Sequence, residues 1–181
     1  MQLLEQLLPR YQFSERHARS IRAEPGRILD CVETVLQQTD PWVSKAIALR
    51  EAPARMWQQL GGDRRLPARP FGFEDFTCLG RIDNQELVFG LAGRFWQANY
   101  GLHPVADAQA FIDLQDVPKL VMNFHVVATD SSSQLSTCTR VYCPDASSLY
   151  RFMPYWYVVR PVSGFIRRRL LSQIASAVGM H

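Results

Sequence analysis

The chain has 181 residues, of which 47% are hydrophobic and 20% are charged, and its formal net charge is +3. This composition is ordinary for a globular protein and excludes a collagen-like, low-complexity or disulfide-dense chain. A net charge this small also argues against a nucleic-acid-binding domain, which carries a larger basic excess. At this length one domain buries about 70% of its unfolded surface, so the core needs no metal or disulfide to stabilise it.

The sequence carries no targeting signal and no metal-binding pattern. Its four cysteines and four histidines show no zinc or redox spacing, so we expect no metal and no cofactor. The N-terminus lacks the basic start of a secretion signal, and no apolar run approaches the ~20 residues that a membrane span requires. The expectation is a cytoplasmic protein with reduced thiols.

The first part of the chain predicts a strand followed by helices. Its expected elements are an N-terminal extension over 1–10, a strand over 11–22, helices over 24–38 and 40–61, and a surface loop over 61–74. An acidic residue before proline is typical of a helix start, because the first turn leaves that backbone position unpaired anyway. Glu24-Pro25 and Asp40-Pro41 both carry this signal.

The rest of the chain alternates as antiparallel strands do and then becomes helical. Strands are expected over 76–82, 86–92, 95–103, 118–128 and 134–143, with either a short helix or an insertion between strands over 106–115. Residues 145–178 predict one long helix with Asp145 as its N-cap. Its inward stripe is expected to contain Phe152, Trp156, Val159, Ile166, Leu170, Ile174 and Val178.

Helices on both sides of a run of antiparallel strands indicate the α+β class rather than a parallel sheet. We predict a single domain over residues 1–181. Its curved antiparallel sheet of six or seven strands bends around the long C-terminal helix, an arrangement known as the helix-grip.

Three stretches give the chain a family resemblance. They are Ser20–Val35 (SIRAEPGRILDCVETV), Met122–Val126 (MNFHV) with Leu135–Val141 (LSTCTRV), and Arg151–Leu171 (RFMPYWYVVRPVSGFIRRRLL). Over Glu15 to Val178 the chain resembles bacterial members of the START-like (SRPBCC) superfamily, which includes birch-pollen-allergen-like, polyketide cyclase and lipid-transfer proteins. It departs from their pattern at Cys138, where such proteins often carry Glu. The resemblance implies an internal cavity for a small hydrophobic or amphipathic ligand, while the chemistry differs between members.

The last two predicted strands form a hairpin with two unlike faces, because alternate side chains point to opposite sides. The set expected inward is Leu120, Met122, Phe124, Val126, Leu135, Thr137, Thr139 and Val141. The set expected on the opposite face is Asn123, His125, Ser136, Cys138, Arg140 and Tyr142. A four-residue loop places Asn123 opposite Cys138 and His125 opposite Ser136.

The polar face of this hairpin is open to two interpretations. Antiparallel sheets commonly have one solvated face, which favours an outer surface. Alternatively, His125 and Arg140 project into the cavity as polar anchors, where a neutral imidazole can act as a base.

Seven residues are the candidates for lining the cavity, which is expected to be mostly apolar with a few polar groups. They are Trp96, Tyr100, Met122, Phe124, Thr137, Thr139 and Trp156. The alternative for the aromatic residues is ordinary core packing. For the two threonines it is a hydroxyl group satisfied by the backbone.

The C-terminal segment is locally basic, because no carboxylate side chain follows Asp145. Arg167-Arg168-Arg169 either meet anionic lipid headgroups or a partner, or form a solvated helix face favoured by the helix dipole. Nucleic acid is not an expected partner, since the sequence shows no platform of aromatic and basic residues.

Three functions remain as hypotheses. The first is binding of a small hydrophobic or amphipathic ligand in the internal cavity. The second is an enzyme of the cyclase or dehydratase type acting on a hydrophobic, polyketide-like substrate, which requires His125 and Arg140 inside the cavity. The third is a non-catalytic interaction protein that uses its basic C-terminal helix at an anionic membrane or a partner.

Overall fold

The structure, a computed structural model, describes residues 2–37, 72–94, 96–97 and 101–179. Its helices are α1 (Leu3–Leu7), α2 (Pro25–Gln37), the 3-10 helix η1 (Phe73–Asp75), α4 (Ala108–Asp113) and α5 (Ala146–Gly179). Its strands are β1 (Phe13–Ile21), β2 (Thr77–Ile82), β3 (Glu86–Gly93), β4 (Leu102–His103), β5 (Lys119–Ala128) and β6 (Ser133–Tyr142). The expected helix over 40–61 and most of the loop over 61–74 lie outside the described residues.

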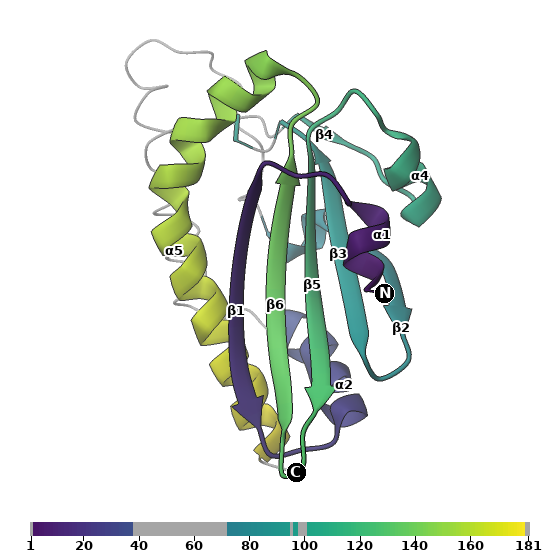
Figure 1. Ribbon diagram of the computed structural model, residues 1–181, viewed down its shortest axis with the longest axis vertical. Helices are drawn as coiled ribbons and strands as arrows, with labels where there is room; N and C mark the ends of the chain where they lie inside the picture. Colours follow the sequence, from purple (N-terminus) through teal and green to yellow (C-terminus); the bar gives the residue numbers. More distant parts are fainter. Residues whose placement is uncertain (1, 38–71, 95, 98–100, 180–181) are drawn as a thin grey trace.

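The described strands form one curved, unclosed antiparallel sheet in the order β1-β6-β5-β3-β2, with β4 paired to β3 (Figure 1). The predicted α+β helix-grip class is confirmed. Of the expected strand over 95–103, only Leu102–His103 is a strand among the residues described there. Gly101, with a φ of 45°, adopts a left-handed conformation that interrupts the extended chain just before it.

The hairpin of β5 and β6 has the predicted register. Asn123 pairs with Cys138 and His125 with Ser136. The alternation of side chains then sends Met122 and Phe124 to one face and His125 to the other, as the sequence predicts.

Helix α5 runs along the edge strand β1, and α2 packs behind the sheet (Figure 1). The larger core cluster lies among these elements and includes Ile28 and Val32 of α2, Phe124 and Leu135 of the sheet, and Ile174 of α5. A second cluster lies toward the start of α5, where the rings of Phe13 and Phe152 are 5.0 Å apart. None of the described helices is both long and apolar enough to cross a membrane.

The inward stripe of α5 differs in part from the predicted one. Ile166 and Leu170 are only half-buried, whereas Arg167 and Leu171 are buried. The predicted spacing of four residues is wrong here for a geometric reason: each step of four turns the helix by 400°, so the stripe drifts by about 40° per step. Along the observed stripe, steps of three and four residues alternate, except for one step of five between Val159 and Gly164. The stripe consists of Trp156, Val159, Gly164, Arg167, Leu171, Ile174 and Val178.

The N-terminal residues, expected to be an extension, pack on the outer face of the sheet. Leu4 and Leu7 of α1 join Phe111 of α4 in a buried cluster over Val88 and Val121. Figure 1 shows α1 and α4 on one side of the sheet and α2 on the other. The sheet is therefore covered on both faces, and residues before β1 belong to the domain core.

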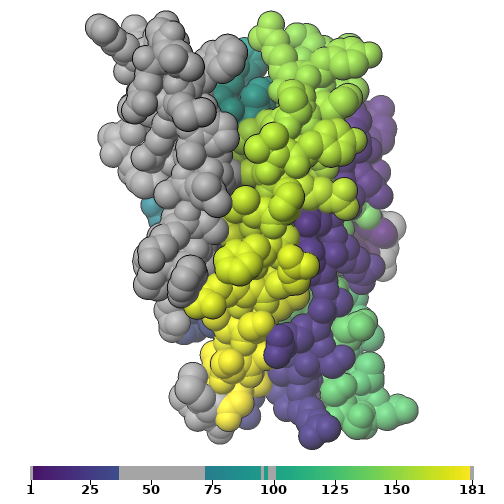
Figure 2. Space-filling view, turned by 90° about the vertical axis from the view of Figure 1, so that its left-hand side faces the viewer, coloured from purple at the N-terminus to yellow at the C-terminus, as the bar shows by residue number. Residues whose placement is uncertain are grey.

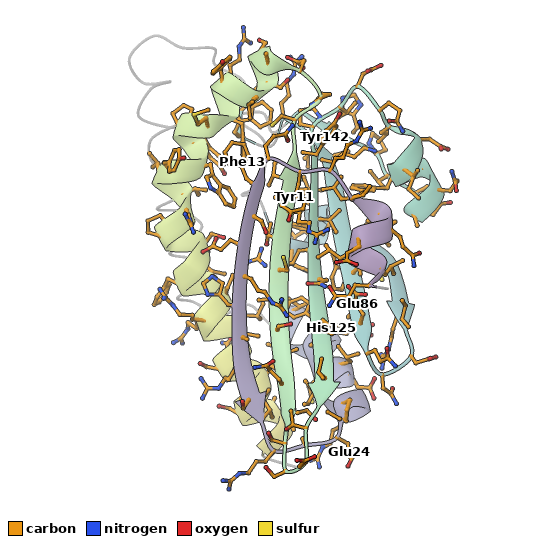
Figure 3. All side chains as sticks on the ribbon, viewed as in Figure 1. Tyr11, Phe13, Glu24, Glu86, His125 and Tyr142 are labelled. Carbon is orange, nitrogen blue, oxygen red and sulfur yellow. The ribbon has the colours of Figure 1, made fainter. Side chains whose placement is uncertain are left out.

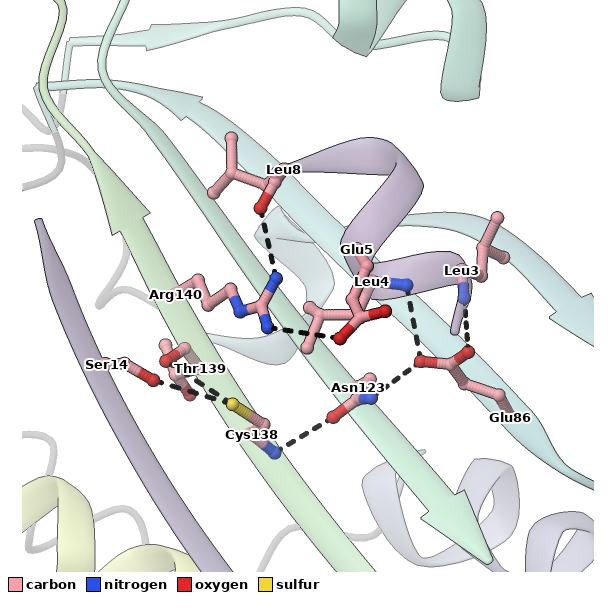
Figure 4. A network of polar contacts seen from close by, with 10 residues as sticks. All are labelled: Leu3, Leu4, Glu5, Leu8, Ser14, Glu86, Asn123, Cys138, Thr139 and Arg140. Atoms are coloured by element: carbon pink, nitrogen blue, oxygen red, sulfur yellow. Dashed lines mark hydrogen bonds and ion pairs between the residues drawn. The ribbon is translucent and has the colours of Figure 1, made fainter. Parts of the chain in front are cut away.

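A buried carboxylate fixes α1 to the sheet (Figure 4). Glu86 on β3 is 1% exposed and accepts hydrogen bonds from the backbone N–H groups of Leu3 and Leu4. The Asn123 side chain donates to the same carboxylate at 2.6 Å and accepts the backbone N–H of Cys138 at 2.9 Å. These bonds satisfy N–H groups at the start of α1 that have no partner within the helix.

We expect Glu86→Ala to lower the free energy of unfolding by about 2–3 kcal/mol, because it leaves several buried donors without an acceptor. Urea denaturation measures the change. Glu33→Ala, an exposed glutamate on α2, is the control and should stay within about 0.5 kcal/mol of the native protein. Similar losses for the two variants would contradict a structural role for the Glu86 carboxylate.

Asp145 caps α5, as its position in the sequence predicts. Its carboxylate accepts the backbone N–H of Ser148 at 2.8 Å and the Ser148 hydroxyl at 2.7 Å. These two bonds, the backbone one foremost, hold the pKa of Asp145 below its usual value.

A group whose pKa is lowered by folding stabilises the fold above its unfolded pKa of about 3.9 and ceases to do so as the pH falls through its folded pKa. Asp145→Ala should therefore lower the urea midpoint at pH 7, and the difference from the native protein should shrink at pH 3. A difference of the same size at both pH values would show that the charge of Asp145 contributes nothing.

Candidate ligand-binding site

A belt of polar side chains lies between the sheet and α5. Its members, here called the polar belt, are Glu15 and His17 of β1, Thr137 and Thr139 of β6, and Arg167 of α5. Glu15 pairs with Thr139 and His17 with Thr137 across the two strands. The polar belt is therefore built from neighbouring positions on one face of the sheet and one position on the helix above it.

Apolar side chains stand on both sides of the polar belt in each element. The residues toward the start of α5 are Phe13, Val141 and Trp156, and those toward its end are Ile21, Leu135 and Leu171. The polar belt therefore lies between the two core clusters on β1, β6 and α5, whereas Phe76 and Leu120 pack against both clusters elsewhere in the core.

Arg167 is the most deeply buried charge of the polar belt. It is 8% exposed, and its Nη1 donates to the Thr137 hydroxyl at 2.9 Å, the one hydrogen bond that its side chain makes to a described residue. Burial lowers the pKa of Arg167 to about 10, and the carboxylate of Glu15 opposes this shift. The guanidinium therefore stays charged at neutral pH, with most of its five N–H donors left for another acceptor.

Glu15 and His17 form a hydrogen-bonded pair beside α5. The Oε1 atom of Glu15 lies 2.9 Å from Nε2 of His17, and the two side chains are 9% and 17% exposed. Gly164 lets the helix approach them: a Cβ atom at that position would stand 2.9 Å from Glu15 Oε1 and 3.5 Å from the imidazole ring. A carboxylate that orients an imidazole is a common acid–base arrangement.

Thr139 brings an unused hydroxyl to the same place. The residue is 4% exposed, and its Oγ1 atom has no hydrogen-bond partner among the described residues. Buried hydroxyls are nearly always paired, so an orphaned one calls for an explanation. The polar belt as a whole thus offers a cation, an acid–base pair and a free hydroxyl within an apolar interior.

The structure gathers most of the predicted lining residues on the inner side of the sheet. Met122 and Phe124 on β5 belong to the larger core cluster and stand beside Thr139 and Thr137. Trp156 is buried with its ring 5.4 Å from that of Phe13. The half-buried Trp96 packs against Phe152, with ring centroids 5.4 Å apart, and Tyr100 lies outside the described residues.

The interpretation of His125 and Arg140 as polar anchors in the cavity is wrong. Both lie on the outer face of the sheet, because their strand positions alternate with those of Phe124 and Thr139. Figure 3 shows His125 close to Glu86, its partner on β3.

Arg140 has a different task on that outer face. Its guanidinium lies over the ring of Tyr11, 4.5 Å from the centroid, and donates to the backbone carbonyl of Leu8 at 3.3 Å. A longer contact of 3.9 Å joins it to the carboxylate of Glu5. Arg140 therefore holds the N-terminal segment against the sheet.

Sequence reasoning missed three members of the polar belt. Glu15 and His17 occupy alternate positions of β1 with Phe13 and Ile21, a pattern that places all four on one face. Arg167 was grouped with Arg168 and Arg169 as one basic patch, whereas it is buried and Arg168 is exposed. No local sequence signal marks position 167: the structure alone shows it on the buried stripe of α5, between Gly164 and Leu171.

Comparisons with known proteins add no family to this picture. Neither the protein-family models nor the curated proteins contain a match to the chain. Within the described residues, no group of three or more His, Cys, Asp or Glu side chains is placed to hold a metal ion.

A double-mutant cycle tests whether Glu15 and Arg167 stabilise each other across the interface. Glu15→Gln and Arg167→Met should each destabilise the protein, because each leaves one charge buried without its counterpart. The double variant should recover part of the loss, with an interaction energy of at least about 1 kcal/mol in urea denaturation. Strictly additive losses would show that the two charges do not interact.

Proposed function

We propose that this protein binds a small amphipathic ligand in the interior between the sheet and α5. The ligand has an apolar body and a head group with oxygen acceptors, as in a carboxylic acid or an ester. The proposal includes membership of the START-like superfamily, which the sequence resemblance predicts and with which the helix-grip fold agrees.

A gradient of polarity across the sheet is the observation that carries the proposal. One row of paired residues runs Phe89, Met122, Thr139 and Glu15 from β3 to β1. The next row runs Leu87, Phe124, Thr137 and His17. In both rows two apolar side chains are followed by a hydroxyl group and then by an ionisable group. Such a surface is complementary to a molecule with one apolar and one polar end.

The unmet hydrogen bonds of the polar belt support the position of the head group. Arg167 retains donors beyond its bond to Thr137, and the hydroxyl of Thr139 has no described partner. Leaving a buried polar group such as the Thr139 hydroxyl unmet costs about 1–3 kcal/mol, and a hydrogen bond to a ligand oxygen would remove that cost. Met122, Phe124 and Trp156 are placed to contact the apolar body.

Native mass spectrometry and probe displacement test this function. Decanoic acid, methyl decanoate and decane share an apolar chain and differ in their head groups. We expect the acid and the ester to raise the melting temperature and to bind more tightly than decane. The proposal fails if no ligand co-purifies and none of the three probes binds.

Arg167→Met separates recognition of the head group from burial of the chain. A hydrogen bond to a charged group contributes about 1.5–3 kcal/mol, so the affinity for decanoic acid should fall about 10- to 100-fold. Binding of decane should stay unchanged. The control is Arg168→Met, which removes the neighbouring exposed arginine and should change the affinity for neither decanoic acid nor decane. If Arg167→Met weakened the binding of all three probes equally, Arg167 would have a structural role only.

An acid–base enzyme of the cyclase or dehydratase type is the second candidate function, favoured by the hydrogen bond between Glu15 and His17. In this version His17, in place of His125, removes a proton from a hydrophobic substrate held in the same interior. Incubation with the co-purified ligand should then give a product of changed mass. The reaction should stop in the His17→Asn variant and persist in the His125→Asn variant. If neither the native protein nor the variants form a product, ligand binding remains the proposed function.

A further inference from the structure

The outward face of α5 exposes large apolar side chains. Tyr150, Tyr157, Val158 and Phe165 have exposed fractions of 70%, 65%, 63% and 44%. With the exposed prolines of the same face they form the α5 stripe, whose members are Tyr150, Pro154, Tyr157, Val158, Pro161 and Phe165. At 100° per residue the six positions fall within an arc of about 100°, and they extend for about 22 Å along the helix. Figure 2 shows α5 running along the molecular surface.

Arginines border the α5 stripe on both sides. The helical rotation places Arg151 about 20° beyond one edge of the stripe, Arg160 about 60° beyond the other edge, and Arg168 in line with the stripe beyond Phe165. All three are exposed. No ion pair to a described residue neutralises them, and α5 contains no Asp or Glu. The helix therefore presents an apolar strip inside a purely cationic frame.

We propose that the α5 stripe and its three arginines dock this protein on the surface of an anionic lipid bilayer. The stripe lies at the boundary of the acyl chains, with the tyrosine hydroxyls at headgroup level, and the arginines reach the lipid phosphates. This surface is separate from the polar belt, which faces the opposite side of α5, so docking does not depend on the proposed ligand.

The shape and charge of the surface favour a bilayer over another protein. The stripe stands on the convex side of a helix, and a fluid bilayer yields around such a ridge, whereas a protein partner needs a matching groove. A second copy of this chain would bring two sets of three unpaired arginines together, and such like charges repel. An anionic membrane surface attracts each of them instead.

The magnitude of the effect follows from the arginines. Each basic residue near an anionic surface strengthens binding about fivefold, so the three together account for roughly a hundredfold. The same attraction is screened by salt, with a Debye length of about 8 Å at physiological ionic strength. Binding should therefore require anionic lipid and weaken at high salt.

Vesicle co-sedimentation of the full chain is the test. Vesicles of phosphatidylcholine with phosphatidylserine are compared with vesicles of phosphatidylcholine alone. We expect binding to the first and little to the second. Arg151→Gln, Arg160→Gln and Arg168→Gln together should reduce binding about a hundredfold, and Tyr157→Ser with Phe165→Ser should reduce it at least tenfold without changing its salt dependence.

A charge-matched control separates this surface from net charge. Arg10, Arg16 and Arg22 are exposed and lie outside α5, so changing all three to Gln lowers the net charge by the same amount and should leave vesicle binding intact. Melting temperatures confirm that each variant is folded. The proposal is overturned by equal binding to neutral vesicles, by equal losses in the two arginine triples, or by no binding at all. If the native protein does not bind vesicles but forms a dimer, and the Tyr157→Ser, Phe165→Ser variant is monomeric, the α5 stripe is a self-association surface instead.

Discussion

A buried positive charge governs how α5 lies on the sheet. Arg167 reaches the hydroxyl of Thr137, and Gly164, one turn earlier, stands over Glu15 and His17. Turning the helix by one residue would rotate it by 100° and bury a different side chain against the pair. The guanidinium and the glycine therefore select one rotation of α5, a specificity that apolar contacts alone provide less sharply.

The two faces of the sheet treat their polar groups differently. On the outer face, Glu86 receives three hydrogen bonds, and Arg140 has a carbonyl acceptor, a carboxylate neighbour and an aromatic ring. On the inner face, Arg167 has one bond to a described residue and Thr139 Oγ1 has none. Fully satisfied polar groups rigidify a fold, whereas unsatisfied ones cost stability. The outer face also holds two unpaired buried nitrogens, His125 Nδ1 and Arg140 Nε, so the polar belt is assigned to a ligand by its gradient of polarity and not by unmet bonds alone.

The sequence predicted those features that depend on local periodicity. Alternation over β5 and β6 gave their faces and register, because a shift by one residue would have exposed Phe124 and buried His125. The length and N-cap of α5 followed from Asp145 and from an apolar helical pattern that continues past Pro154 and Pro161. The rest required contacts across the chain: α1 has only five residues, too short to be recognised as a stable helix by itself, and its leucines are meaningful only against the sheet.

Arg167 was missed for a related reason. A charged residue in a basic run is usually solvated, and nothing local marks one arginine of three as buried. Position 167 is suitable for a cation only because of residues that are distant in the sequence. These are Glu15 and His17 on β1 and the threonine hydroxyls of β6, together with Gly164 on the helix itself. Sequence periodicity therefore predicts apolar stripes, but it does not identify buried polar residues whose partners are distant in the sequence.

The two faces of α5 are linked by the helix itself. Because Arg167 and Gly164 fix which side faces the sheet, they also fix the side on which Tyr157, Phe165 and Arg168 emerge. The inner and outer residues alternate within single turns, so a ligand that engages Arg167 and a membrane that engages Arg168 act on adjacent residues of one helix. Arg167 and the outward stripe lie on one continuous helix, so a ligand that shifted the backbone at Arg167 would also shift the neighbouring stripe residue Phe165. In this geometry the face proposed for the bilayer and the belt proposed for the ligand belong to the same helix.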